Sequence, residues 1–134
     1  MPPYEIQGAG TGTQGTYLVS LIVSTKDKNI SDEVLKRAAV HGVLFRGFSD
    51  TVSRKTQKPL AGSAANEAEH ADFYKEFFGD GGTSANYANV VPGSRGVTKS
   101  NKLYRVKVTI SVNKESLLKY LQDVGVVKGL NSIF

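Results

Sequence analysis

Three glycines near the amino end have a spacing that occurs in phosphate-binding loops. Gly10, Gly12 and Gly15 fit the pattern G-x-G-x-x-G, with which a backbone approaches a pyrophosphate at the start of a helix. Dinucleotide binding requires a strand before these glycines and a helix after them. Here a polar, glycine-rich stretch precedes them and the apolar alternation of a strand follows. The spacing alone therefore does not predict a nucleotide site.

The two histidines of the chain, His41 and His70, are the candidates for hydrolysis or metal binding. Glu69, Asp72 and Glu76 lie near His70. On a helix Glu69, His70 and Asp72 do not share a face, and a catalytic metal usually has three convergent protein ligands. His41 falls at a predicted helix end, where an imidazole has a structural use. We expect structural roles, and no catalytic set, metal site or cofactor; a hydrolase using His41 or His70 remains the third hypothesis.

Lys and Arg residues are unevenly distributed along the chain. Residues 83–134 have a net charge of +6, whereas residues 1–82 have a net charge of −1. A basic face binds nucleic acid by releasing counterions, but basic residues also protect edge strands from unwanted pairing and keep a domain soluble. A nucleic-acid-binding module that uses the basic face of residues 95–107, with Tyr87 and Tyr104 for stacking, is the second hypothesis. The candidate binding residues are Arg54, Lys55, Lys58, Arg95, Lys99, Arg105 and Lys107.

Length and composition limit the class of protein. The chain has 134 residues, of which 40% are hydrophobic and 22% charged, and it has no Cys. This composition excludes a disordered or fibrous chain, disulfides, thiolate metal sites and thiol nucleophiles. No apolar run approaches the ~20 residues that cross a bilayer, and no signal sequence is visible. We expect one soluble domain over residues 16–134, preceded by a flexible leader over residues 1–15.

The first half of the domain has strand and helix patterns in turn. Residues 16–24 alternate as a strand, and Ser31 is placed as the N-cap of a helix that runs to about Val40. Gly42 then stops the helix before a short apolar strand over residues 43–45. Residues 49–63 are polar and contain Pro59 and Gly62, which predicts a long surface loop.

The second half predicts a helix, a hairpin and a last helix. Asn66 and Glu69 resemble a capping box for an aromatic helix that ends at Gly79, and residues 87–91 read as a strand. Residues 104–112 alternate strictly between apolar and polar side chains, which indicates a strand of a sheet with one solvent-exposed face. Asn113 caps the last helix. The apolar tail, with Leu130, Ile133 and Phe134, is expected to pack in the core.

The order of these elements, β-α-β-α-β-β-α, predicts the fold class. It is α+β: a single four-stranded mixed or antiparallel sheet with helices packed on one face, because the last long strand has only one apolar side to bury.

Several segments carry a resemblance that covers residues 10–134: GTGTQGTYLVSLIVS, RAAVHGVLFRGF, QKPLAG, HADFYKEFF and SVNKESLLKYLQDVGVVKGLNSIF. Together they resemble a group of small, uncharacterised α+β proteins of the Bacteroidetes whose members look exported. This implies a mature chain that carries a replacement Met1. At fold level the chain is distantly similar to periplasmic domains of envelope-assembly lipoproteins, of the curli-secretion and penicillin-binding-protein-activator types, but it lacks their lipidation Cys.

The leading hypothesis is therefore a non-enzymatic binding or assembly domain of the bacterial cell envelope. Its expected partner is a protein or another envelope component rather than nucleic acid. The ligand and the oligomeric state are left open.

Overall fold

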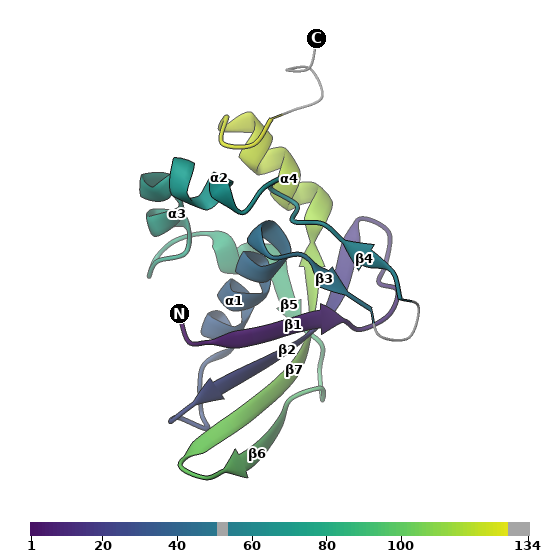
Figure 1. Ribbon diagram of the computed structural model, residues 1–134, viewed down its shortest axis with the longest axis vertical. Helices are drawn as coiled ribbons and strands as arrows, with labels where there is room; N and C mark the ends of the chain where they lie inside the picture. The colour runs from purple at the N-terminus through teal and green to yellow at the C-terminus, as the bar shows by residue number, and fades with distance from the viewer. Residues whose placement is uncertain (51–53, 129–134) are drawn as a thin grey trace.

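An antiparallel sheet forms the centre of the structure, a computed structural model that describes residues 1–50 and 54–128. Its longest strand is β7 (Leu103–Asn113), and β2 (Thr16–Thr25) pairs with it along the whole length of β2. Val19, Leu21 and Val23 of β2 and the alternate valines and isoleucine of β7 are buried on one face. Arg105 and Lys107 are exposed on the other. The alternation of residues 104–112 thus reflects a sheet with one face packed against helices and the other exposed to solvent, as predicted (Figure 1).

The amino end contains a strand that the sequence did not predict. Residues 4–8, expected from the sequence to be part of a flexible leader, form strand β1 (Tyr4–Gly8) and pair antiparallel with β2. Tyr4 is only 8% exposed, and Ile6 packs against the core. Five residues with two apolar positions give too short a pattern to predict a strand alone. Burial of Tyr4 and Ile6 against the helix behind them stabilises it.

That helix is α1 (Asp32–Phe45), capped as predicted by the Ser31 side chain, which accepts from the Val34 N–H. It continues past Gly42, so the predicted strand over residues 43–45 is wrong. A Cβ atom at Gly42 would lie 2.7 Å from Ile6 Cδ1, so this glycine gives room to β1 rather than ending the helix. Gly47, at φ +69°, is the residue in the left-handed conformation that follows the helix.

Between α1 and the last strands the chain forms a small second sheet and two short helices. A two-stranded sheet of β3 (Phe48–Ser49) and β4 (Thr56–Gln57) occupies part of the predicted loop over residues 49–63. The predicted aromatic helix is divided into α2 (Ala65–Glu69) and α3 (Ala71–Phe77). Asn66 is not a capping residue; it is buried, accepts from the Tyr74 hydroxyl at 2.6 Å and donates to the Val126 carbonyl at 2.7 Å.

The remaining elements complete the sheet. A 3-10 turn, η1 (Ser84–Tyr87), leads into β5 (Ala88–Val90), and β6 (Gly96–Ser100) follows. Both strands pair with the same edge of β7, at opposite ends. The main sheet therefore has five strands, ordered β1-β2-β7-β5 with β6 also on β7. The α+β class and antiparallel pairing are confirmed, but the predicted four strands and their order are wrong, because the expected leader contains β1 and the expected connection contains β6.

Helix α4 (Lys114–Asp123) follows β7 directly, and the Asn113 side chain caps it by accepting from the Ser116 N–H. Leu117 and Leu121 are fully buried in the core. The predicted packing of Leu130, Ile133 and Phe134 lies outside the described residues. No helix in the described part of the chain has the length and apolarity needed to cross a membrane.

Candidate functional site

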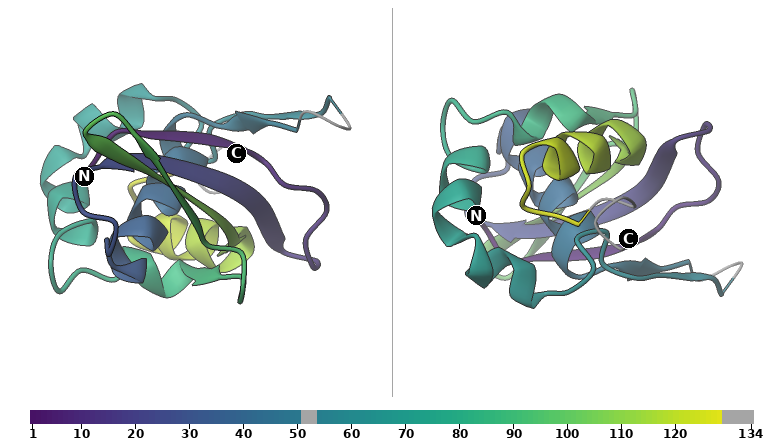
Figure 2. Two further views of the ribbon diagram at one scale, coloured as in Figure 1. Left: turned by 90° about the horizontal axis from the view of Figure 1, so that it is seen from below. Right: turned by 90° about the horizontal axis from the view of Figure 1, so that it is seen from above.

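Two hairpins extend from the body of the protein in the same direction (Figure 2). One is β1–β2 with its glycine-rich loop, and the other is β3–β4. Between them, and against the first turn of α4, lies a hollow of about 840 Å³. Its lining comes from four separate parts of the chain: residues 8–18, Phe48 with Asp50, Lys55 with Gln57, and Lys114 with Glu115. The residues that face one another here are thus far apart in the sequence.

The glycine-rich loop, residues 9–15, forms one wall of the hollow. Gly10 and Gly15 have φ values of +107° and +82°, which side-chain-bearing residues rarely adopt. The loop is held at both ends: the Gly10 N–H donates to Asp50 Oδ2 at 3.1 Å, and the Gly15 carbonyl accepts from the Glu115 N–H at 3.2 Å. Contacts with Asp50, which follows β3, and with α4 therefore add to the bonds that the loop makes with its own hairpin, where Thr16 donates to the Thr13 carbonyl.

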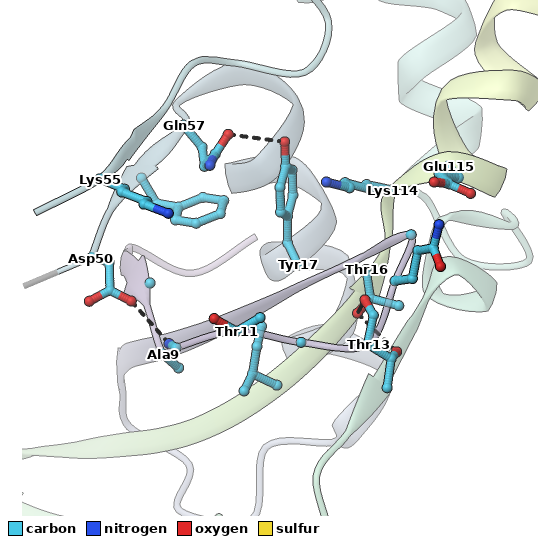
Figure 3. Close-up of a pocket in the computed structure, with 17 residues that line it drawn as sticks. Ala9, Thr11, Thr13, Thr16, Tyr17, Asp50, Lys55, Gln57, Lys114 and Glu115 are labelled. Atoms are coloured by element: carbon cyan, nitrogen blue, oxygen red, sulfur yellow. Dashed lines mark hydrogen bonds between the residues drawn. The ribbon is translucent and has the colours of Figure 1, made fainter. Parts of the chain in front are cut away.

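Tyr17 stands in the middle of the hollow (Figure 3). Its hydroxyl donates to Gln57 Oε1 at 3.2 Å, and its ring meets Phe48 edge-on at a centroid distance of 5.1 Å. The Lys114 ammonium lies over the same ring, 4.2 Å from its centroid. Burial raises the pKa of the Tyr17 phenol, so the group remains a proton donor at neutral pH. These contacts fix an aromatic surface between the two hairpins.

Charged side chains are arranged in two mixed pairs. Asp50 and Lys55 lie at one end of the hollow, and Lys114 and Glu115 lie at the other (Figure 3). Each pair combines a carboxylate, which only accepts hydrogen bonds, with an ammonium, which only donates them. The four formal charges cancel. The hollow is polar at both ends but has no net charge.

The predicted basic residues do not form one surface. Lys55 lines the hollow. Arg54 and Lys58, which are close to it in the sequence, are exposed to solvent. Arg95 instead reaches the start of α1, where it contacts Asp32 at 3.2 Å and the Lys28 carbonyl at 3.0 Å.

On the hairpin of β6 and β7, Arg105 lies 3.9 Å from Glu5, and the Lys99 ammonium lies 5.8 Å from the Tyr104 ring centroid. Lys107 is exposed on the wet face. Tyr87 is not part of this hairpin: its ring stacks on that of Tyr120 in α4. The structure thus places Lys55 at the hollow, with Arg54 and Lys58 exposed outside its lining. The other candidate residues lie on the β6–β7 hairpin and, for Arg95, at the start of α1.

The histidines occupy different environments. His41 Nε2 lies 2.7 Å from Glu67 Oε2, and its Nδ1 is hydrogen-bonded to the Tyr4 hydroxyl. Both ring nitrogens are thereby used to join β1, α1 and α2. His70 is the residue between α2 and α3, and its N–H donates to the Asn66 carbonyl. Neither histidine lines the hollow, and no cluster of three metal-ligating side chains is found in residues 1–50 and 54–128.

Sequence reasoning found the glycine spacing and Lys55, but it missed Tyr17, Asp50, Gln57, Lys114 and Glu115 as neighbours. Asn113 was the one indication of where Lys114 and Glu115 lie. A helix that is capped directly after a strand has its first residues at the end of that strand. As the sequence predicted, a strand rather than a helix follows the glycines. No family model, curated protein or solved structure matches this chain.

Proposed function

We propose that the protein is a binding domain of the bacterial cell envelope and that the hollow between its two hairpins is the ligand site. The observation that carries this proposal is the convergence of an aromatic ring, two ammonium groups and two carboxylates from four parts of the chain on one cavity of about 840 Å³. Ligand sites are concave surfaces of this kind, with aromatic side chains and a few well-placed polar groups.

The contacts within the site support a binding role. Tyr17, Asp50, Lys114 and the glycine-rich loop are all held by neighbours before any ligand arrives. A site that is ordered in advance loses less conformational entropy when it binds. The placement in the envelope is supported by the sequence resemblance to exported proteins.

Nuclear magnetic resonance of the full ¹⁵N-labelled chain tests the ligand site. Three pools of probes are added: neutral oligosaccharides, dipeptides with free termini, and inorganic phosphate with dicarboxylates. At least one pool should shift the amide signals of residues 9–16 and the side-chain amide of Gln57 in a saturable manner. Lys114→Met should weaken this binding, whereas Lys107→Met, on the wet face of the sheet, should leave it unchanged. If no pool affects the loop, the proposal is wrong.

The same spectra decide the rival interpretation. A single-stranded oligonucleotide is added at about 0.15 M salt, where phosphate contacts are already weakened by counterions. We expect no saturable shifts in β6 and β7. Saturable binding that is lost in Arg105→Ala and Lys107→Ala would make the protein a nucleic-acid-binding module instead.

A further inference from the structure

The hairpin formed by β6 and the first residues of β7, residues 96–107, is a second exposed surface and is called the basic hairpin below. Every residue of β6 is exposed, and in the facing part of β7 only Tyr104 and Val106 are shielded from solvent. Its turn lies at the end of the molecule opposite α4 (Figure 1). The hollow lies at the other end of β7, where α4 begins. The basic hairpin is therefore separate from the proposed ligand site.

The charges of the basic hairpin all have the same sign. Residues 96–107 contain three lysines and one arginine and neither Asp nor Glu. Arg105 is half exposed and lies 3.9 Å from Glu5, and the Lys99 ammonium lies 5.8 Å from the Tyr104 ring centroid. Within residues 1–50 and 54–128, Lys102 and Lys107 have no hydrogen-bond or ion-pair partner. The cations of this surface are thus accessible to an anionic partner.

Exposed apolar side chains lie beside these cations on both faces of the hairpin. Val97 pairs with Val106, and Leu103 pairs with Ser100. Because side chains alternate between the two faces along a strand, Val97 and Leu103 point to opposite faces. They are 43% and 40% exposed. Lys99 shares the face of Val97, and the basic residues of β7 share the face of Leu103. Each face therefore combines an exposed aliphatic side chain with at least one cation.

This combination favours a lipid surface over nucleic acid. Single-stranded nucleic acids are bound through cations together with aromatic rings that stack on the bases. In the basic hairpin the Tyr104 ring is partly buried, and the exposed apolar side chains are aliphatic. Aliphatic side chains gain no stacking energy from bases, but they do lose unfavourable contact with water when they enter a lipid layer.

The surface of an anionic bilayer provides for both kinds of side chain. Its headgroups attract lysine and arginine, and the boundary between headgroups and acyl chains receives aliphatic groups. Lipids are fluid and can surround a hairpin that is exposed on both faces. We propose that the basic hairpin binds the surface of anionic lipid bilayers, with Val97 and Leu103 inserted among the headgroups.

Sedimentation with lipid vesicles tests this proposal with the full chain. One set of vesicles contains equal parts of phosphatidylglycerol and phosphatidylcholine, and the other contains phosphatidylcholine alone. The chain should sediment with the anionic set only, and added salt should weaken the binding. Lys99→Gln and Lys102→Gln should each weaken it about five-fold. Lys75→Gln and Lys119→Gln remove the same charge from exposed positions of α3 and α4 and should leave the binding unchanged.

Two further variants test the insertion of the apolar side chains. Val97→Ser should weaken binding to the anionic vesicles about five-fold. Val124→Ser changes a valine of similar exposure, 46%, that follows α4, and should have no effect. The chain has no Trp, so Leu103→Trp introduces a single fluorescent reporter. Its emission should move to shorter wavelengths on the anionic vesicles, because the ring leaves water.

Several results would overturn the proposal. These are no sedimentation with anionic vesicles at low salt, equal losses in the hairpin and helix variants, and an unshifted emission of the reporter. Tighter binding of a single-stranded oligonucleotide than of the vesicles would make the hairpin a nucleic-acid interface instead. Unchanged far-ultraviolet circular dichroism of the variants shows that a loss of binding does not come from unfolding. Because the hollow lies at the other end of β7, a failure here leaves the proposed ligand site standing.

Discussion

Tyr4 anchors the first strand, and its substitution tests whether that strand belongs to the cooperative fold. Its ring is buried against α1, its hydroxyl is bonded to His41, and the Arg46 guanidinium lies 4.1 Å from the ring centroid. Arg46 also donates to the Tyr4 carbonyl at 3.1 Å. Four kinds of contact thus hold one residue that lies only three positions from the start of the sequence.

The magnitude follows from these contacts. Removing a large buried aromatic side chain costs about 3–5 kcal/mol, and a site near a chain end can relax, so we expect about 3 kcal/mol for Tyr4→Ala. Tyr4→Phe keeps the ring and removes only the hydrogen bond to His41, which should cost about 1–2 kcal/mol. For a chain of this size each kcal/mol lowers the Tm by about 3–5 °C.

Urea unfolding at pH 7, followed by circular dichroism, measures both variants. Val97→Ala, on the exposed strand β6, is the matched control and should change the stability by less than about 0.5 kcal/mol. If Tyr4→Ala unfolds at the same urea concentration as the wild type, β1 contributes nothing to the folded state. Equal losses for Tyr4→Ala and Tyr4→Phe would instead refute the assignment of most of the energy to ring burial.

Two further perturbations test the packing. Burial raises the pKa of Tyr4 and of Tyr74 to about 12, so the unfolded chain loses these protons at a lower pH than the folded chain does. The free energy of unfolding should be unaffected below pH 10 and fall as the pH rises from 10 to 12. It should fall less steeply in Tyr74→Phe. This is measured by urea unfolding at a series of pH values, and an equal slope in that variant would contradict it. Gly47→Ala places a Cβ atom 2.3 Å from the Gln57 carbonyl oxygen at a φ of +69°, and should cost more than about 2 kcal/mol. Gly10→Ala, with a φ of +107° but no atom within 4 Å, should cost clearly less by the same assay.

The parts of the fold that the sequence predicted are those with long, regular patterns. The strand over residues 104–112 and the caps Ser31 and Asn113 have local signals that no distant residue alters. Gly42 shows the opposite case. A glycine after apolar residues is a reasonable helix end, but here the close approach of Ile6 from another element explains it. That contact cannot be read from the helix itself.

The candidate site was less predictable than the fold. Lys114 and Glu115 are at the start of a helix, and Asp50 is at the end of a two-residue strand. Each looks like an ordinary surface residue in its own segment. Only the joint projection of the two hairpins brings these side chains together (Figure 2), and that arrangement depends on β1, which the sequence did not predict.

The hydrogen bond from the Glu115 N–H to the Gly15 carbonyl makes the glycine-rich loop part of the N-terminal cap of α4. Amide protons in the first turn of a helix exchange quickly with solvent unless an acceptor holds them. A displacement of the loop by little more than an ångström would release this proton to water. The isotope exchange rate of a single helical amide therefore reports on the position of a loop that begins more than one hundred residues earlier in the chain.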